Sequence, residues 1–156
     1  MNIVWKKLLP CLALPLTVGG LSAFLVRGGM EDYRALTLPP LSPPGWLFPM
    51  VWTVLFLLMG TASYLASMSG GPKRAVQRAL RLYATQLAVN FLWPILFFGL
   101  GRYLLSFFWL LLLWLLIIHT VFLFFRLSRP AGLLLLPYLL WVTFAGYLNL
   151  GVYLLN

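Results

Sequence analysis

The chain has 156 residues, of which 63% are hydrophobic, 17% aromatic and only 8% charged. Soluble domains carry about 25% charged residues, so this composition cannot cover a water-facing surface and favours a membrane protein. The formal net charge of +9 would suggest nucleic-acid binding in a soluble protein. Here the basic residues lie between apolar segments, where they are better explained as topology signals. We therefore expect a membrane protein with no nucleic-acid partner.

Five apolar segments follow one another along the chain, each near the ~20 residues that span ~30 Å of hydrocarbon. None shows the alternation of a membrane β-strand, and helices satisfy their backbone groups without water. We predict an all-α membrane protein with a single domain over residues 1–156. Its five transmembrane helices are expected at about 5–26, 45–68, 76–100, 102–126 and 130–155.

Basic residues are distributed unequally between the two ends of the predicted bundle. One end carries eight, namely Lys6, Lys7, Lys73, Arg74, Arg78, Arg81, Arg126 and Arg129. The other end carries three, namely Arg27, Arg34 and Arg102. Because cytoplasmic loops are enriched in Lys and Arg, we expect a multi-pass protein of a bacterial membrane with a cytoplasmic N-terminus.

The first connection, from Arg27 to about Pro44, is long and rich in proline, whereas the other three are tight. A loop of this length in a compact protein is usually functional or disordered. Its prolines stiffen it and argue against disorder. We therefore interpret the first connection as a lid over one end of the bundle.

The predicted helix interiors offer little acid–base chemistry. They lack Asp, Glu, Lys and Arg, which argues against an ion-coupled transporter, and no residue cluster has the spacing of a metal site. No serine has a nearby histidine base, so a hydrolytic triad has no support. The single histidine, His119, has two interpretations: an axial haem ligand, or a neutral imidazole hydrogen-bonded to a neighbouring helix.

Neutral polar and aromatic residues share faces of three predicted helices. In the third helix, Gln86, Asn90 and Trp93 lie on one face, and Pro94 frees the carbonyl of Asn90, which predicts a kink there. The fifth helix carries Trp141, Ala145 and Asn149 on one face, one turn after Pro137. The second helix carries Phe48, Trp52 and Phe56 on one face, with Pro49 near its start.

These faces have two interpretations. The amides can join helices while the aromatic rings fill the core. Alternatively, the faces line a cavity with aromatic walls, suited to a flat apolar ligand with polar edges. Ala84 and Ala88 allow a close helix approach, either within the chain or between two copies.

Three motifs in order resemble those of the TspO/MBR family, which comprises the bacterial tryptophan-rich sensory proteins and the mitochondrial translocator protein, or peripheral-type benzodiazepine receptor. The first is PPGWLFP at residues 43–49, followed by Trp52. The second is YATQLAVNFLW at residues 83–93, followed by FFG at 97–99. The third is PYLLW at residues 137–141, followed by Phe144-Ala145 and Leu148-Asn149.

The resemblance covers nearly the whole chain and implies a five-helix bundle, commonly a homodimer, with a pocket capped by the first loop. It implies porphyrins, haem-related tetrapyrroles or drug-like aromatic molecules as ligands. Membrane lipid is a further expected partner, and no cofactor or metal is required. By position, the resemblance assigns ligand contacts to Trp52, Trp141, Asn90 and the loop residue Tyr33. Further lining positions are Phe48, Gln86, Trp93, Ala145 and Asn149.

Three positions depart from the family pattern. Asp32 and Leu41 stand where the first loop usually carries tryptophan, so the lid should contact a ligand differently. After Tyr153 no Lys or Arg follows, which weakens the case for sterol recognition.

We expect a membrane receptor or sensor that binds porphyrins or related tetrapyrroles and regulates tetrapyrrole metabolism or a stress response. One alternative is a light-dependent porphyrin-degrading enzyme in which Trp52 and Trp141 take part. Another is a transporter of porphyrin or lipid.

Overall fold

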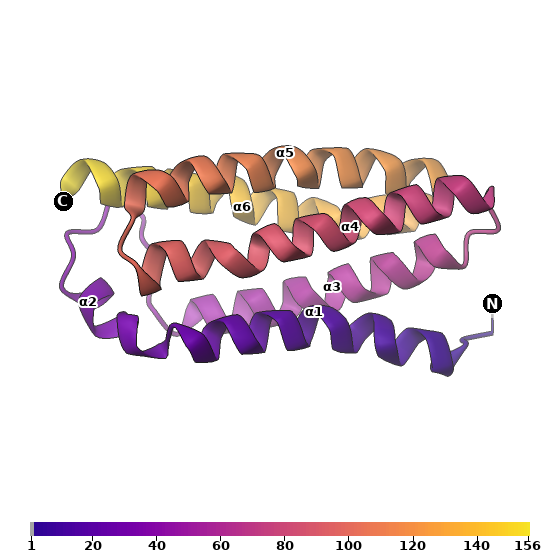
Figure 1. The fold of residues 1–156 in the computed structure, drawn as a ribbon, viewed down its shortest axis with the longest axis horizontal. Helices are drawn as coiled ribbons and strands as arrows, with labels where there is room; N and C mark the ends of the chain where they lie inside the picture. The colour runs from indigo at the N-terminus through magenta and orange to yellow at the C-terminus, as the bar shows by residue number, and fades with distance from the viewer. Residues whose placement is uncertain (1) are drawn as a thin grey trace.

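The computed structural model describes residues 2–156. Five long helices form an antiparallel bundle, and the described residues contain no strand (Figure 1). The long helices are α1 (Trp5–Leu25), α3 (Leu47–Ser67), α4 (Lys73–Pro94), α5 (Tyr103–Leu127) and α6 (Arg129–Leu155). Each is long and apolar enough to cross a membrane, which confirms the predicted fold class.

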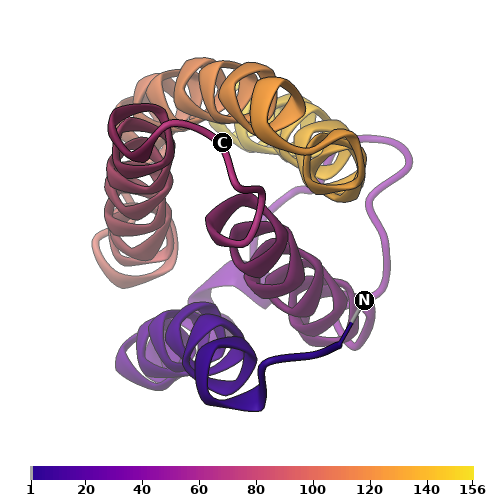
Figure 2. The same cartoon turned by 90° about the vertical axis from the view of Figure 1, so that its right-hand side faces the viewer.

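The helices do not contribute equally to the core. Helix α6 packs on α5 and α3, and α4 packs on α5, whereas α1 packs mainly on α3. In the end-on view of Figure 2, α1 lies at the edge of the bundle. Only Pro15 and Ser22 of α1 are buried, so most of this helix faces lipid.

One glycine sets the distance between α1 and α3. A Cβ atom added to Gly60 would lie 2.6 Å from the Cys11 carbonyl oxygen and 2.8 Å from Leu12 Cα. No side chain larger than hydrogen fits between the two backbones. Glycine at an interface lets membrane helices approach closely, because lipid provides no hydrophobic force to join them.

The first connection contains a short helix that the sequence analysis missed. After α1 ends, the 3₁₀ turn η1 (Arg27–Gly29) leads directly into α2 (Met30–Arg34), and an extended segment then returns to α3. Figure 1 shows these segments at the end of the bundle opposite the N-terminus. We call residues 27–46 the lid.

Three contacts tie the extended part of the lid to the last turns of α6. The backbone N–H of Thr37 donates to Asn156 Oδ1, and Asn156 Nδ2 donates back to the Thr37 carbonyl. The Tyr147 hydroxyl donates to the Pro40 carbonyl at 2.7 Å. A Cβ atom on Gly151 would lie 2.6 Å from Pro39, so the proline ring of the lid rests directly on the α6 backbone.

The proline near the end of α4 is followed by a change of helix type, and the predicted kink stays a prediction. Helix α4 continues past Pro94 as the π-helical turn η2 (Ile95–Gly99). Proline cannot donate a backbone hydrogen bond, and a wider turn accommodates the loss. This turn places Phe97 and Phe98 against the lid residue Tyr33, with ring centroids 6.0 and 5.2 Å away.

Neither interpretation of His119 agrees with the structure. Its side chain is exposed on the outer face of α5, and within residues 2–156 it has no hydrogen bond to a neighbouring helix. It also lies outside the cavity described below. Ala84 and Ala88 are likewise exposed on the outer face of α4, so they do not mediate a close contact within the chain.

Candidate functional site

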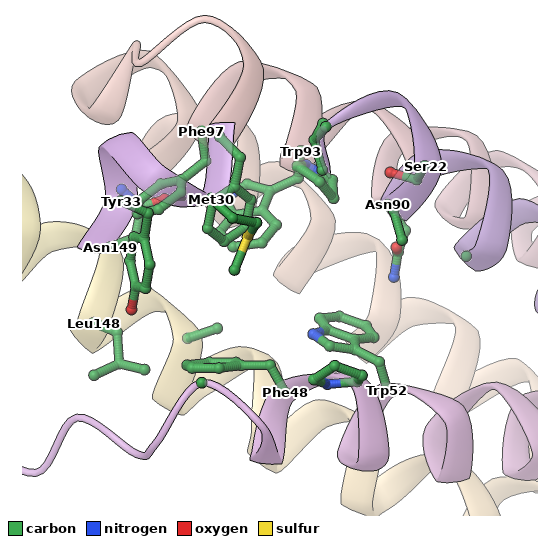
Figure 3. A pocket seen from close by; sticks show the side chains of 18 of the residues that line it. Ser22, Met30, Tyr33, Phe48, Trp52, Asn90, Trp93, Phe97, Leu148 and Asn149 are labelled. Atoms are coloured by element: carbon green, nitrogen blue, oxygen red, sulfur yellow. Dashed lines mark hydrogen bonds between the residues drawn. The ribbon is translucent and has the colours of Figure 1, made fainter. Parts of the chain in front are cut away.

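A cavity of about 350 Å³ lies at the lid end of the bundle, enclosed by α1, α3, α4, η2 and α6. Figure 3 shows Phe48 and Trp52 of α3 facing Trp93 and Phe97 across the open space, with Met30 and Tyr33 of the lid at one side. Concave, mostly apolar spaces of this size commonly bind small molecules. The cavity is therefore the candidate ligand site.

Most of the sequence-predicted site residues border this cavity. They are Tyr33, Phe48, Trp52, Asn90, Trp93, Trp141, Ala145 and Asn149. Gln86 is the exception, because it lies behind the cavity wall with only 1% of its surface exposed. The shared helical faces correctly placed the helix residues of this set together, whereas Tyr33 was assigned through the family resemblance. Ligand binding by all of them stays a prediction.

Aromatic rings form the walls and hold one another in place. Trp52 stacks on Phe56 one turn along α3, with ring centroids 5.5 Å apart. Phe48 meets the Trp141 ring edge-on at 5.9 Å, and Trp93 stacks on Phe97 at 5.2 Å. These neighbours restrict the ring orientations, so the walls are formed before any ligand arrives.

A chain of hydrogen bonds orients the amide of Asn90. Asn90 Nδ2 donates to the Tyr138 hydroxyl at 2.7 Å, and that hydroxyl donates to Gln86 Oε1 at 2.7 Å. Gln86 therefore acts on the cavity through Tyr138. Within residues 2–156, Asn90 Oδ1 has no protein donor, so the cavity wall offers one hydrogen-bond acceptor to a ligand.

Asn149 has a different role from Asn90, although both line the cavity. Its Oδ1 accepts from Trp93 Nε1 at 3.0 Å and from Ser106 Oγ at 3.1 Å. Its Nδ2 donates to the Tyr103 carbonyl at 2.8 Å. Because these bonds use most of its capacity, Asn149 holds Trp93 in place and has little left for a ligand.

The indole of Trp141 lies between two spaces. One face borders the cavity, and the same residue borders a shallow apolar groove on the outer surface between α3 and α6. The groove also includes Val54, Leu58 and Leu140. Trp141 Nε1 is buried and has no hydrogen-bond partner in residues 2–156, so Trp141 offers aromatic surface, and not its N–H group, to the cavity.

Tyr33 is the lid residue that reaches the cavity. It is half-buried against Phe97 and Phe98, and burial raises the pKa of its phenol above the ordinary value. A raised pKa keeps the hydroxyl neutral at physiological pH. Tyr33 can therefore donate or accept a hydrogen bond at the cavity edge, and it adds no negative charge.

Other lining residues were not identified from the sequence. They include Ser22, Arg27, Met30, Ser42, Phe97, Leu148 and Val152. Leu148 and Val152 continue the α6 face that carries Trp141 and Ala145, so helical spacing could have indicated them. Arg27 gave no such signal, because only the fold of η1 brings it to the cavity.

The lining residues include no carboxylate, lysine, histidine or cysteine. Within residues 2–156, no group of three His, Cys, Asp or Glu side chains could hold a metal ion. The chemistry of the site therefore consists of aromatic surfaces, neutral hydrogen-bonding groups and the single cation of Arg27.

Comparison with known proteins gives one consistent result. The model of the TspO/MBR family matches residues 11–155. The chain belongs to the TspO/MBR family. The family assignment agrees with the five-helix bundle and with the three motifs in their observed order.

Individual family members are similar over nearly full length. The tryptophan-rich protein TspO of Chlorobaculum tepidum is 43% identical, covering 100% of this chain and 99% of its own. That of Archaeoglobus fulgidus is 38% identical over the same shares. The translocator protein of Bos taurus is 39% identical, covering 93% of this chain and 87% of its own. TspO/MBR proteins span the membrane, which agrees with the five apolar helices.

Proposed function

We propose that the protein is a membrane receptor that binds a porphyrin or related tetrapyrrole in the lid-end cavity and thereby regulates tetrapyrrole metabolism or a stress response. The observation that carries the proposal is the pair of tryptophans, Trp52 and Trp141, on the cavity walls. A flat macrocycle offers large apolar faces to such indoles. Each aromatic contact contributes about 0.5–1.5 kcal/mol beyond the area that it buries.

The polar groups of the cavity fit the edge of such a ligand. Asn90 Oδ1 can accept a hydrogen bond, and the Tyr33 hydroxyl at the cavity edge can donate or accept one. The remaining surface is apolar, so other flat aromatic molecules, including drug-like ones, should compete for the same space.

Titration of the purified protein with protoporphyrin tests this proposal. Binding should quench tryptophan fluorescence, and Trp52→Phe combined with Trp141→Phe should weaken binding roughly tenfold or more through two lost indole contacts. Trp5→Phe is the matched control, because Trp5 is 59% exposed near the N-terminus, away from the cavity. An unchanged dissociation constant in the double variant would contradict the site.

A second candidate function rests on the same two indoles. Light-excited porphyrin held against an oxidisable indole could be opened by dioxygen, and no acid–base residue is needed. Illumination of the complex in air should then give a bilin-like product that is lost with Trp52→Phe or Trp141→Phe. Bleaching at equal rates in all variants would leave binding as the function.

We further propose that the N-terminal end of the bundle faces the cytoplasm. In the fold, the eight basic residues named above all belong to that end, and the lid end carries three together with Glu31 and Asp32. Reporter fusions at the two chain ends test this orientation, because the N-terminus and C-terminus lie at opposite ends of the bundle (Figure 1).

We also propose a homodimer that packs through the outer face of α4. Ala84 and Ala88 are exposed there, one turn apart, and small residues at this spacing let two membrane helices approach closely. Ala84→Leu with Ala88→Leu should shift the protein to monomer in light scattering. A dimer of unchanged strength would place the interface elsewhere.

A further inference from the structure

Arg27 is the single charged residue among those that line the cavity. It begins η1, two residues after α1 ends, and is therefore the first residue of the lid, at the mouth of the cavity. We propose that Arg27 binds a carboxylate group of the ligand at this mouth. The proposal rests on the proposed function and specifies the ligand class further, as a tetrapyrrole with an acidic edge.

The guanidinium of Arg27 is held in place on one side only. Its Nη1 donates to the Phe24 carbonyl at 2.9 Å, and its Cζ lies 3.8 Å from the centre of the Phe24 ring. Stacking on an aromatic face and one backbone bond restrict the side chain without neutralising it. The other N–H groups have no protein acceptor in residues 2–156.

No carboxylate of the chain occupies this position. Glu31 and Asp32 follow within one helical turn on α2, yet both are exposed, and neither forms an ion pair with Arg27 in the described residues. The fold therefore leaves an unpaired cation on a residue that lines the apolar cavity, with its guanidinium resting on the exposed ring of Phe24. A planar guanidinium presents paired N–H donors at the spacing of carboxylate oxygens, so an acidic ligand group is its natural partner.

The position at the end of α1 makes such a contact feasible. Charges are costly within the hydrocarbon but are tolerated at helix ends, where long side chains reach the interface. A flat ligand with its apolar faces between Trp52 and Trp141 can keep its acidic edge at the mouth. The carboxylate then stays near water while it binds Arg27, so neither charge is buried deeply.

The test compares two probes on three proteins in nanodiscs of zwitterionic lipid. The probes are protoporphyrin, which has two carboxylic acids, and its dimethyl ester, which has none. The variants are Arg27→Gln and the control Arg34→Gln, whose arginine is exposed on the same lid but does not line the cavity. Fluorescence quenching gives each dissociation constant, and thermal unfolding confirms that all three proteins are folded.

We expect the unchanged protein and Arg34→Gln to bind the acid roughly three- to tenfold more tightly than the ester, as a partly exposed charged contact predicts. Arg27→Gln should abolish this preference, so that the variant binds the acid and the ester equally tightly. A fourth protein, Arg27→Lys, should keep part of the preference, because the charge remains and the paired donors are lost.

Four outcomes overturn the inference. Arg27→Gln could keep the preference for the acid, or Arg34→Gln could lose it to the same degree, which would indicate a general effect of positive charge. If neither porphyrin binds the unchanged protein, the proposed function itself is overturned, and the carboxylate site with it. Ester binding with no acid preference overturns only the carboxylate site.

Discussion

The side chain of Asn156 pairs with both backbone polar groups of Thr37. Thr37 N lies 3.0 Å from Asn156 Oδ1, and Asn156 Nδ2 lies 2.9 Å from the Thr37 carbonyl oxygen. The pairing joins residues 119 positions apart in the chain. It fixes the extended part of the lid to the end of α6, and the Tyr147–Pro40 hydrogen bond adds a second attachment.

Loss of the lid attachment should speed ligand release. Tyr147→Phe removes one hydrogen bond worth about 0.5–1.5 kcal/mol, so the dissociation rate should rise roughly two- to tenfold. Asn156→Leu removes two bonds and should have a larger effect. Stopped-flow measurement of porphyrin release provides the readout.

Tyr153→Phe is the matched control for these variants. Tyr153 is about as exposed as Tyr147 on the same helix but donates no hydrogen bond to the lid. Equal release rates for Tyr147→Phe and Tyr153→Phe would show that the attachment does not limit release.

A side chain at Gly151 should also disturb the lid, because Gly151 contacts Pro39. Gly151→Ala places a Cβ atom 2.6 Å from the proline ring, so the lid must move away from α6. Gly146 lies on the same helix as Gly151, and a Cβ atom in Gly146→Ala meets only Leu110 of α5 at 3.9 Å, an ordinary contact. Ligand affinity should fall in the first variant and stay unchanged in the second, as measured by fluorescence titration. A fall of equal size in both would argue against the contact.

Close packing of α1 on α3 predicts a stability difference between two glycine variants. Gly60→Ala forces the α1 backbone away and should cost roughly 1–3 kcal/mol, typical of overpacking. Gly20→Ala, on α1, meets nothing within 4 Å and should be neutral or slightly stabilising. Thermal unfolding in the same detergent compares them, and similar melting temperatures for both would contradict the close approach.

Removal of the hydroxyl group should change the free energy of unfolding differently at two buried tyrosines. Tyr138→Phe breaks the chain from Asn90 to Gln86 and should destabilise the protein by about 1–3 kcal/mol, since buried amide groups lose a partner. The Tyr83 hydroxyl is buried without a partner in residues 2–156, so Tyr83→Phe should be neutral or stabilising.

Unfolding and binding measurements on both tyrosine variants check this prediction. Porphyrin affinity should also fall in Tyr138→Phe, because Asn90 becomes free to rotate. Equal loss of stability in both variants would indicate that Tyr83 has a partner such as an ordered water.

Much of the architecture could be predicted from hydropathy and helical spacing. Five apolar segments fixed the helix count, and the i, i+4 relations among Trp141, Ala145 and Asn149 placed them on one wall. The same reasoning grouped Gln86 with Asn90 and wrongly predicted that both line the cavity. Residues one turn apart differ in direction enough that Asn90 faces the cavity and Gln86 lies behind it.

The features that escaped prediction depend on tertiary contacts. Helix α2 has only five residues, too few for a periodic pattern, and it forms where the lid packs against η2. Arg27 looked like a topology signal because its sequence neighbours do not reveal a cavity beside it. The pairing of Asn156 with Thr37 joins two ends of the sequence, and no local pattern indicates it.

The place of Trp141 between the cavity and the outer groove has a consequence for how binding is measured. Among the described residues, Trp141 is the one that borders both the cavity and the outer groove. A turn of that ring would connect the cavity with the bilayer, so a ligand dissolved in lipid could enter without crossing water. Affinity would then follow the mole fraction of ligand in the membrane, and the apparent aqueous dissociation constant would rise in proportion to the amount of lipid in the sample.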